Sequence, residues 1–359
     1  MKHKFNYNWN LKDTIFTKDK GKVFSCFACG GGSTMGYKLA GFDVIGHNDI
    51  DKKMIEVYKA NHNPKFSYLE SITTFAKKKD LPKELYELDI LDGSPPCSSF
   101  SMAGNREKDW GKEKVFREGQ ELQVLDTLFF DFIDLAKELQ PKVVVAENVK
   151  GLLMGEARQY VIKIYKAFDE AGYYCQHFLL NASKMGVPQK RERVFFICLR
   201  KDLATKFLYQ ADMFTELPKI EMEFNEPEIL FKEVRDYSGN IERPLTGLVI
   251  PNIWNLKQYG DADMGATTKR EFNKEKLFSY KYLYNDKVCN TVTAKDVGLL
   301  FDEPRYCNKL ELCSIGSYPI DYNFLNNRPQ YLIGMSVPPI MTAQIASNIY
   351  EQWISKLIN

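Results

Sequence analysis

The sequence predicts a doubly wound α/β fold with a mostly parallel sheet, together with a second, smaller domain. Two observations favour this fold class. Over the first 200 residues, short apolar runs alternate with amphipathic runs, which is the pattern of parallel strands covered by helices. After Asp202 the alternation fades into acidic stretches and short segments punctuated by Gly, Pro and Asn. A chain of 359 residues is also long enough to form two domains.

Six apolar runs are predicted strands, and the amphipathic runs between them are predicted helices. We expect the strands at 22–28, 43–47, 88–92, 142–147, 173–180 and 193–199. We expect the helices at 33–40, 51–61, 121–139 and 156–171, several with Gly or Pro just past the end. A last apolar-periodic helix, 344–357, returns to the first domain. The domains are thus predicted at 1–200, completed by 330–359, and at 201–329.

The composition limits the possible classes of protein. No apolar run approaches the ~18 residues of a membrane span, and the first residues lack the apolar core of a signal peptide, so we expect a cytoplasmic protein. Eight scattered cysteines predict reduced thiols and no metal site, with Cys26 and Cys29 as structural residues. The net charge of +2 is not typical of a nucleic-acid-binding protein as a whole, so a nucleic acid would have to bind at a local basic patch.

A glycine-rich turn follows the first predicted strand and leads into the first predicted helix. Gly30, Gly31 and Gly32 lack a Cβ, so a ligand can approach the backbone and the helix N-terminus closely. Asp49 or Asp51 stands about 20 residues further on, where an acidic side chain holds ribose hydroxyls in dinucleotide folds. The pattern favours a nucleoside cofactor over a mere tight turn. By itself it does not separate NAD from S-adenosylmethionine.

Cys97 follows the predicted strand 88–92 after two consecutive prolines. Pro95 and Pro96 fix φ and remove two backbone donors, so the thiol is presented at a strand end instead of being packed. Open α/β sheets keep their active sites at the carboxyl ends of their strands. We therefore interpret Cys97 as a nucleophile, for which protease, redox and alkyl-transfer chemistry are all open.

Two further polar groups are expected near the same edge of the sheet. Glu147 ends the continuous apolar strand 142–147, where partial desolvation favours a carboxyl group that can hold a proton near neutral pH. A helix cap is the alternative. Gln189, Arg191 and Arg193 alternate onto one face of a segment that enters a strand, and this row of donors suits a phosphate, a polar base or a carboxylate.

These motifs, in this order, resemble those of the DNA (cytosine-5) methyltransferase family. The similarity comprises the Phe27 to Gly32 cofactor loop, the Pro96-Cys97 motif, the motif from Glu147 to Val149 and the Gln189-x-Arg191-x-Arg193 motif. Segments 291–294 and 333–339 match as well. The resemblance implies a class I S-adenosylmethionine-dependent methyltransferase fold and a small target-recognition domain.

The resemblance also implies a reaction. Cys97 would add to C6 of a cytosine flipped out of duplex DNA, and C5 would then take a methyl group from S-adenosylmethionine. Glu147 would protonate or hydrogen-bond the ring, with Gln189, Arg191 and Arg193 supporting these two residues. The implied cofactor contacts are Phe27, Ala28, Gly30, Gly32, Asp49, Ile50, Ser71, Pro96, Leu128 and Ser336. The family pattern is broken at Cys29, at Ser71, where an acidic residue is common, and at Met335.

Nucleic-acid contacts are expected from a loop and from the small domain. Segment 101–120, beginning at Ser101, is the predicted loop that closes over the flipped base. Segment 267–287 interleaves cations with aromatic residues, which suits phosphate contacts and stacking, although the aromatic residues also fit a small core. The basic candidates are Lys269, Arg270, Lys274, Lys276 and Lys281.

The predicted partner is double-stranded DNA, with a possible cognate restriction endonuclease, and the protein is expected to be a monomer. Three other functions remain open. A tRNA cytosine-5 methyltransferase would use the same Cys97 and Glu147. A catalytically weak homologue would only bind DNA. An NAD-dependent oxidoreductase would explain the glycine-rich turn alone.

Overall fold

The computed structural model describes residues 2–96, 113–114, 123–124, 127–155, 157–212, 215–239 and 243–357. The chain divides into two compact units. The small unit comprises Met1–Thr14, Ala182–Arg191 and Phe224–Met341, and the large unit comprises Ile15–Asn181, Glu192–Glu223 and Thr342–Asn359. These limits differ from the predicted boundaries near 201 and 330. One reason is strand pairing within the small unit, which draws in Ala182–Arg191.

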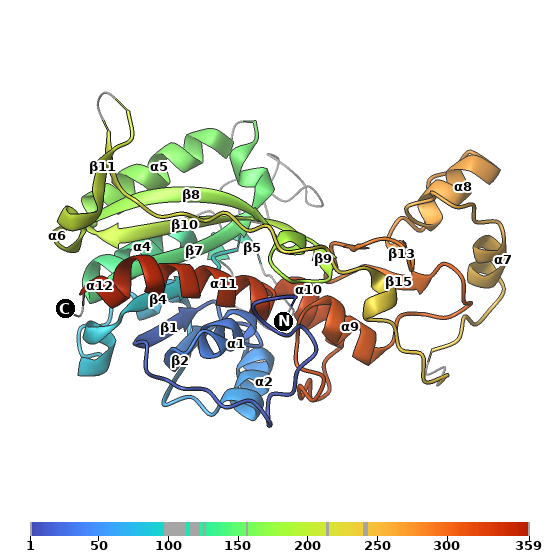
Figure 1. Ribbon diagram of the computed structural model, residues 1–359, viewed down its shortest axis with the longest axis horizontal. Coiled ribbons are helices and arrows are strands. Elements are labelled where there is room, and N and C mark those ends of the chain that lie inside the picture. Colours follow the sequence, from blue (N-terminus) through green and yellow to red (C-terminus); the bar gives the residue numbers. More distant parts are fainter. Residues whose placement is uncertain are drawn as a thin grey trace. The chain divides into compact units, whose positions relative to one another are not determined.

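The large unit is built on a seven-stranded sheet with the strand order β3-β2-β1-β4-β7-β10-β8 (Figure 1). The strands are β1 (Lys22–Cys26), β2 (Asp43–Asp49), β3 (Phe66–Leu69), β4 (Ile90–Gly93), β7 (Val143–Val149), β8 (Tyr173–Asn181) and β10 (Glu192–Arg200). β10 is antiparallel to both β7 and β8, whereas the other neighbours are parallel. The topological switch point therefore falls between β1 and β4, where ligands bind in doubly wound folds.

Helices cover both faces of this sheet. They are α1 (Gly32–Leu39), α2 (Lys52–His62), α3 (Ile72–Phe75), α4 (Leu128–Leu139), α5 (Ala157–Glu170), α6 (Lys201–Ala204), α11 (Pro339–Ile349) and α12 (Ser355–Leu357). Asp92 of β4 bonds to Tyr37 of α1, whereas a Cβ on the next residue, Gly93, would lie 2.5 Å from Phe132 of α4. Because successive strand residues point to opposite faces, α1 and α4 cover opposite sides of the sheet.

The predicted fold class is confirmed, and most predicted elements lie within a few residues of the observed ones. β3 and α3 were not predicted, because β3 has four residues that are half-buried or exposed and so shows no continuous apolar run. The predicted helix 121–139 is helical from Leu128, and part of its start lies outside the described residues. The last helix begins earlier than predicted, at Pro339, because proline is tolerated in a first helical turn.

The small unit is held by short parallel pairings. β9 (Gln189–Lys190) pairs with β14 (Cys289–Asn290), and β13 (Tyr280–Leu283) pairs with β15 (Val297–Leu300). Its helices are α7 (Val249–Asn255), α8 (Met264–Phe272), α9 (Lys309–Ile315) and α10 (Pro329–Met335). Met264, Tyr282, Tyr284 and Leu299 form a core against α7 and α8.

Two antiparallel strand pairs lie outside the seven-stranded sheet. They are β5 (Glu113–Lys114) with β6 (Gln123–Val124), and β11 (Leu208–Gln210) with β12 (Glu216–Pro218). Within the described ranges, no helix combines the length and the apolar character that a membrane crossing requires.

Candidate active site

The glycine-rich turn between β1 and α1 is tight and uses left-handed backbone. Phe27, Cys29 and Gly31 have φ values of 53°, 48° and 85°. A Cβ at Gly31 would lie 2.3 Å from Nε2 of His62, so the turn needs glycine there for space as well as for its backbone conformation. The same His62 nitrogen lies 3.3 Å from the carbonyl oxygen of Gly30. The sequence thus folds into the close backbone turn that was predicted for a ligand.

Asp49 holds this turn from the end of β2. Its carboxylate accepts hydrogen bonds from the backbone N–H of Cys29 at 2.7 Å and of Asp51 at 2.8 Å. Burial raises the pKa of Asp49 to about 6, although these backbone hydrogen bonds oppose the rise. Asp51, the other acidic candidate, is instead the N-cap of α2, where it accepts from Lys53 N at 2.9 Å. Asp49 is therefore the acidic group that lies against the glycine-rich turn.

The other predicted cofactor residues of the large unit follow strand ends or begin helices. Ser71 follows β3 and caps α3 by accepting a hydrogen bond from Thr74 N at 3.2 Å. Leu128 is the buried first residue of α4. Ala28 is buried, and Ile50 and Pro96 are partly exposed. Their contact with a cofactor stays a prediction.

Glu147 and Arg193 form an ion pair between neighbouring strands. Nε of Arg193 lies 2.8 Å from Oε1 of Glu147, and the two side chains are 16% and 14% exposed. Glu147 lies on β7 and Arg193 is the second residue of the antiparallel partner strand β10, so the main chain of both strands fixes the pair. A carboxylate and a guanidinium thus meet at the carboxyl end of β7, where the sequence predicted a functional acid.

The strand end that leads to Cys97 lies beside this ion pair. Gly93 at the end of β4 is in register with Ala146, the residue before Glu147. Two residues after Gly93, the carbonyl oxygen of Pro95 accepts a hydrogen bond from Nδ2 of Asn148 at 3.4 Å. Cys97 itself lies outside the described residues, as does Ser101. The described chain therefore brings Pro95 to the β7 end, two residues before the predicted nucleophile.

Gln189 and Arg191 hold backbone segments within the small unit. Arg191 is 2% exposed, and its guanidinium donates to the carbonyl oxygens of Val292 at 2.8 Å and Gly334 at 2.9 Å. Gln189 accepts from Val292 N at 2.8 Å and donates to the Ile315 carbonyl at 3.2 Å. The predicted row of Gln189, Arg191 and Arg193 therefore serves two different places. Gln189 and Arg191 bind the backbone of the small unit, whereas Arg193 binds Glu147.

The motif around Val292 is clamped from a second side by α10. A Cβ on Gly334 would lie 2.3 Å from the backbone of Thr293, and Gln330 donates to the Thr293 carbonyl at 2.7 Å. Ser336, which ends α10, uses its hydroxyl to donate to Leu332 O at 2.8 Å and to accept from Tyr318 at 2.6 Å. The 291–294 and 333–339 motifs therefore pack together as one piece of the small unit.

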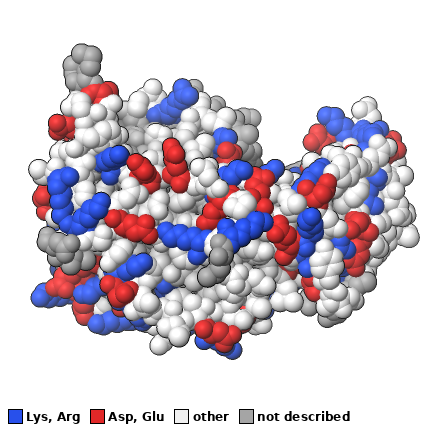
Figure 2. All heavy atoms as spheres, in the orientation of Figure 1, with Lys and Arg blue, Asp and Glu red and all other residues white. Residues whose placement is uncertain are grey.

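The predicted nucleic-acid contacts divide into two groups. Arg270 is ion-paired with Asp261, and Lys281 lies 2.7 Å from Asp263, so both cations are already engaged. The exposed group comprises Lys269, Lys274 and Lys276, and among the described residues no ion pair joins these three to a carboxylate. Figure 2 shows lysine and arginine gathered at the end of the small unit that carries α8, with acidic side chains beside them.

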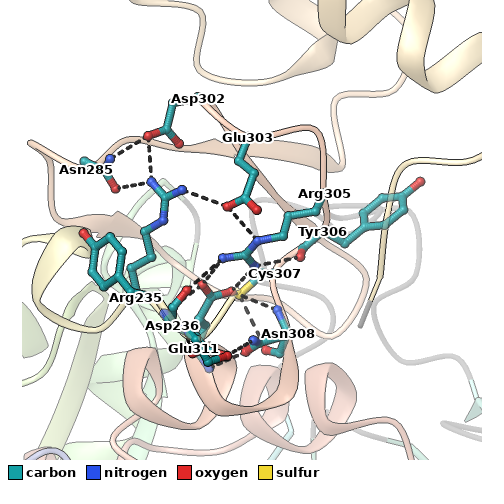
Figure 3. A network of polar contacts seen from close by, with 12 residues as sticks. Arg235, Asp236, Asn285, Asp302, Glu303, Arg305, Tyr306, Cys307, Asn308 and Glu311 are labelled. Carbon is teal, nitrogen blue, oxygen red and sulfur yellow. Dashed lines mark hydrogen bonds and ion pairs between the residues drawn. The ribbon is translucent and has the colours of Figure 1, made fainter. Parts of the chain in front are cut away.

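A buried polar network stabilises the small unit (Figure 3). Arg305 and Glu311 are 4% and 0% exposed in their side chains, and two guanidinium nitrogens of Arg305 bind the two carboxylate oxygens at 2.8 Å and 2.9 Å. Glu311 also accepts from the backbone N–H of Asn308 and Asp236. Arg235 ties the same region to Asp302. These bonds fix the start of α9 to the loop at 235–236.

Replacing Glu311 by Gln is expected to lower the free energy of unfolding of the full chain by about 3 kcal/mol, because the buried Arg305 cation loses its fully buried carboxylate partner and keeps only the more exposed Glu303. Urea unfolding followed by circular dichroism measures the loss. Glu271→Gln is the matched control, since Glu271 pairs with Arg270 at the surface and should cost less than about 1 kcal/mol. Equal losses in the two variants would contradict the prediction.

The structure reveals one group at the sheet edge that the sequence interpretation missed. Asp92 is 4% exposed and accepts hydrogen bonds from Ser25 at 2.7 Å and Tyr37 at 3.1 Å. A signal for it was present in the sequence. A strand covered on both faces is normally apolar throughout, so a carboxylate at the third position of β4 is anomalous.

Comparisons with known proteins agree with this geometry. The family model for C-5 cytosine-specific DNA methylase matches residues 21–351. The type II methyltransferase M.NgoPII of Neisseria gonorrhoeae is 39% identical over 189 residues, which are 52% of this chain and 50% of that protein. The chain therefore spans about half the length of that relative. M1.HphI of Haemophilus parahaemolyticus is 27% identical over 340 residues, covering 90% of this chain and 85% of the relative.

Solved structures show the same fold. A prophage-encoded protein of Escherichia coli has a TM-score of 0.63 at 20% identity, covering 92% of this chain and 99% of its own. DNMT2 of Spodoptera frugiperda has a TM-score of 0.60 at 18% identity, covering 94% and 99%. The fold is that of class I S-adenosylmethionine-dependent methyltransferases. With its family model matched over nearly its whole length, the chain belongs to the C-5 cytosine-specific DNA methylase family.

Proposed function

We propose that the protein transfers a methyl group from S-adenosylmethionine to C5 of cytosine within a short site in double-stranded DNA. The observation that carries the proposal is the Glu147–Arg193 ion pair, which lies at the carboxyl end of β7 beside the Pro95-Pro96 turn leading to Cys97. Family membership supports the same reaction. The topological switch point between β1 and β4, with the glycine-rich turn that follows β1, supports the proposal that the protein binds S-adenosylmethionine.

The residues around the switch point suit S-adenosylmethionine. The glycine-rich turn offers close backbone approach, and Asp49 places a partly exposed carboxylate against that turn, where it can accept hydrogen bonds from ribose hydroxyls. The bound cofactor supplies an electrophilic methyl group. Phe27, which is partly buried near Phe132, is proposed to line the same pocket.

The proposed chemistry overcomes the weak nucleophilicity of cytosine C5. The Cys97 thiolate forms a bond to C6, and the C5–C6 π electrons shift so that C5 becomes enamine-like. Glu147 stabilises this state by hydrogen bonding or proton donation at N3, with Arg193 fixing its carboxylate. C5 then takes the methyl group, and loss of the C5 proton returns an electron pair that expels Cys97. The cytosine must first be flipped out of the duplex, at a cost of a few kcal/mol.

The small unit is proposed to bind the DNA. Lys269, Lys274 and Lys276 are exposed cations on α8 and the segment that follows it, and Phe272 and Phe278 are 53% and 63% exposed beside them. Exposed cations neutralise phosphates, and exposed aromatic rings pack on sugars or bases. Arg270 and Lys281 would instead hold this surface in shape, because their charges are paired within the unit.

The proposal is tested by incubating the protein with methyl-labelled S-adenosylmethionine and either plasmid DNA or tRNA, then mapping 5-methylcytosine. Label in plasmid cytosines at a short repeated site is the expected result. Label in tRNA alone would show an RNA methyltransferase instead. No label in either polymer would overturn the proposed activity.

The biological setting is proposed from the relatives' names. M.NgoPII is named a type II methyltransferase, whereas a 37% identical relative from Bacillus phage SPR is named an orphan methyltransferase. The protein therefore acts either together with a cognate restriction endonuclease or as an orphan methyltransferase without one. A monomeric, cytoplasmic protein remains our expectation.

A further inference from the structure

Asp92 occupies the topological switch point of the large unit. In the parallel pairing of β1 with β4, Asp92 is in register with Ser25, and Gly93 with Cys26. The strand order of the sheet runs in one direction from β1 and in the opposite direction from β4. Ligands of doubly wound folds bind outside the carboxyl ends of two such strands. Asp92 therefore lies directly beneath the proposed cofactor site, although the proposed reaction gives it no role.

The carboxyl group of Asp92 is buried among uncharged partners. Its two oxygens accept hydrogen bonds from Ser25 Oγ at 2.7 Å and Tyr37 Oη at 3.1 Å. Ser25 lies on β1 just before the glycine-rich turn, and Tyr37 lies on α1 just after it. A carboxylate without a cation is costly to bury, and two neutral hydroxyls offset only part of that cost.

The surroundings of Asp92 are mainly acidic or neutral. Burial raises the pKa of Asp92 to about 7, Ser25 and Tyr37 oppose this rise, and the negative charge of Glu147 adds to it. Among the described residues, the titratable groups that interact with Asp92 are Cys26 on β1, Tyr37 on α1, Tyr58 on α2 and Glu147 on β7, and Glu147 is paired with Arg193 on β10. The only cation in this set is already paired with Glu147. The edge of the sheet thus favours a cationic ligand.

We propose that Asp92 is the charge partner of the cofactor's methylsulfonium and selects S-adenosylmethionine over the demethylated product. This inference rests on the proposed function. When the methyl group moves to C5, the C5–CH3 bond forms, the S–CH3 bond breaks, and the electron pair stays on sulfur, which becomes a neutral thioether. The product therefore loses its attraction to Asp92, and its release is favoured. Asp92 acts through the electrostatic field as a selectivity residue, not as a catalytic one.

The proposal makes cofactor selectivity depend on pH. In the free protein Asp92 keeps its proton up to near neutral pH, because its folded-state pKa is raised. A cationic ligand favours the carboxylate, so binding of S-adenosylmethionine should release a proton and tighten as the pH rises. S-adenosylhomocysteine has the same amino and carboxylate groups but a neutral sulfur. The ratio of the two affinities therefore isolates the effect of the sulfonium charge.

Isothermal titration calorimetry of the full chain with each ligand, at about pH 6 and about pH 8, tests the proposal. The preference for S-adenosylmethionine should rise about tenfold across this range in the wild type. In Asp92→Asn the preference should be low and independent of pH. Asp89→Asn is the matched control, because Asp89 precedes β4 at its opposite end and pairs with Lys142, so it should keep the wild-type slope.

Thermal melting of the free protein provides a readout that needs no ligand. Because the raised pKa of Asp92 costs stability progressively as the pH rises from the usual carboxyl value of about 4 toward about 7, Asp92→Asn should melt higher than the wild type near pH 8, with a smaller difference near pH 5. A wild-type preference that does not change with pH, or an unchanged preference in Asp92→Asn, would overturn this proposal alone. If neither ligand binds the wild type, the proposed function fails, and this inference fails with it.

Discussion

Replacing Cys97 by Ser is expected to abolish methyl transfer, lowering the rate by at least about 10³-fold. A serine hydroxyl at this position is a far weaker nucleophile than a thiolate, so no bond to C6 forms and C5 stays unreactive. The measurement is transfer of labelled methyl groups to plasmid DNA. Binding of DNA should remain, because the proposed DNA contacts lie on the small unit and do not involve the thiol.

A covalent trap makes this prediction specific to the thiol. DNA containing 5-fluorocytosine cannot lose its C5 substituent as a proton, so the wild-type protein should stay bound and migrate with the DNA in a denaturing gel. Cys97→Ser should give no such band. Cys175→Ala, which alters a buried cysteine of β8, is the control and should give the wild-type band. A trapped band with Cys97→Ser would identify another nucleophile.

Strand ends could be predicted from the sequence because their signals are local. The apolar run at 143–146 is completely buried in β7, and it places Glu147 at the sheet edge, as expected. Asp49 was likewise placed by its distance from the glycine-rich turn and preferred to Asp51 through the family resemblance, and the structure shows Asp49 against that turn and Asp51 as the cap of α2. Periodicity and spacing fix such positions without any knowledge of long-range contacts.

Contacts between distant segments could not be predicted in this way. Arg191 and Arg193 are two residues apart and share a strand-like pattern, yet Arg191 binds the carbonyl of Gly334 and Arg193 binds Glu147. Arg191 is the residue between β9 and β10, whereas Arg193 lies within β10, and no residue type marks this break between the strands. Asp92 was missed for a related reason, since its partner Tyr37 lies 55 residues earlier in the chain.

Replacing Glu147 by Gln is expected to lower the rate of methyl transfer by about 10²- to 10⁴-fold, because an amide keeps the size of the side chain but cannot give a proton to cytosine N3. Single-turnover transfer to plasmid DNA is the measurement. Glu192→Gln is the matched control on the neighbouring strand, since Glu192 pairs with Lys150 and both side chains are over 40% exposed. That control should keep near wild-type activity.

A double-mutant cycle separates the roles of Glu147 and Arg193. If Arg193 acts by fixing the Glu147 carboxylate across 2.8 Å, Arg193→Met should slow the wild type but add little to the loss in Glu147→Gln. Additive losses would instead mean that Arg193 contacts the DNA or the base directly. The cycle is informative because both side chains are mostly buried and lie on the paired strands β7 and β10, so the main chain holds each residue near the other.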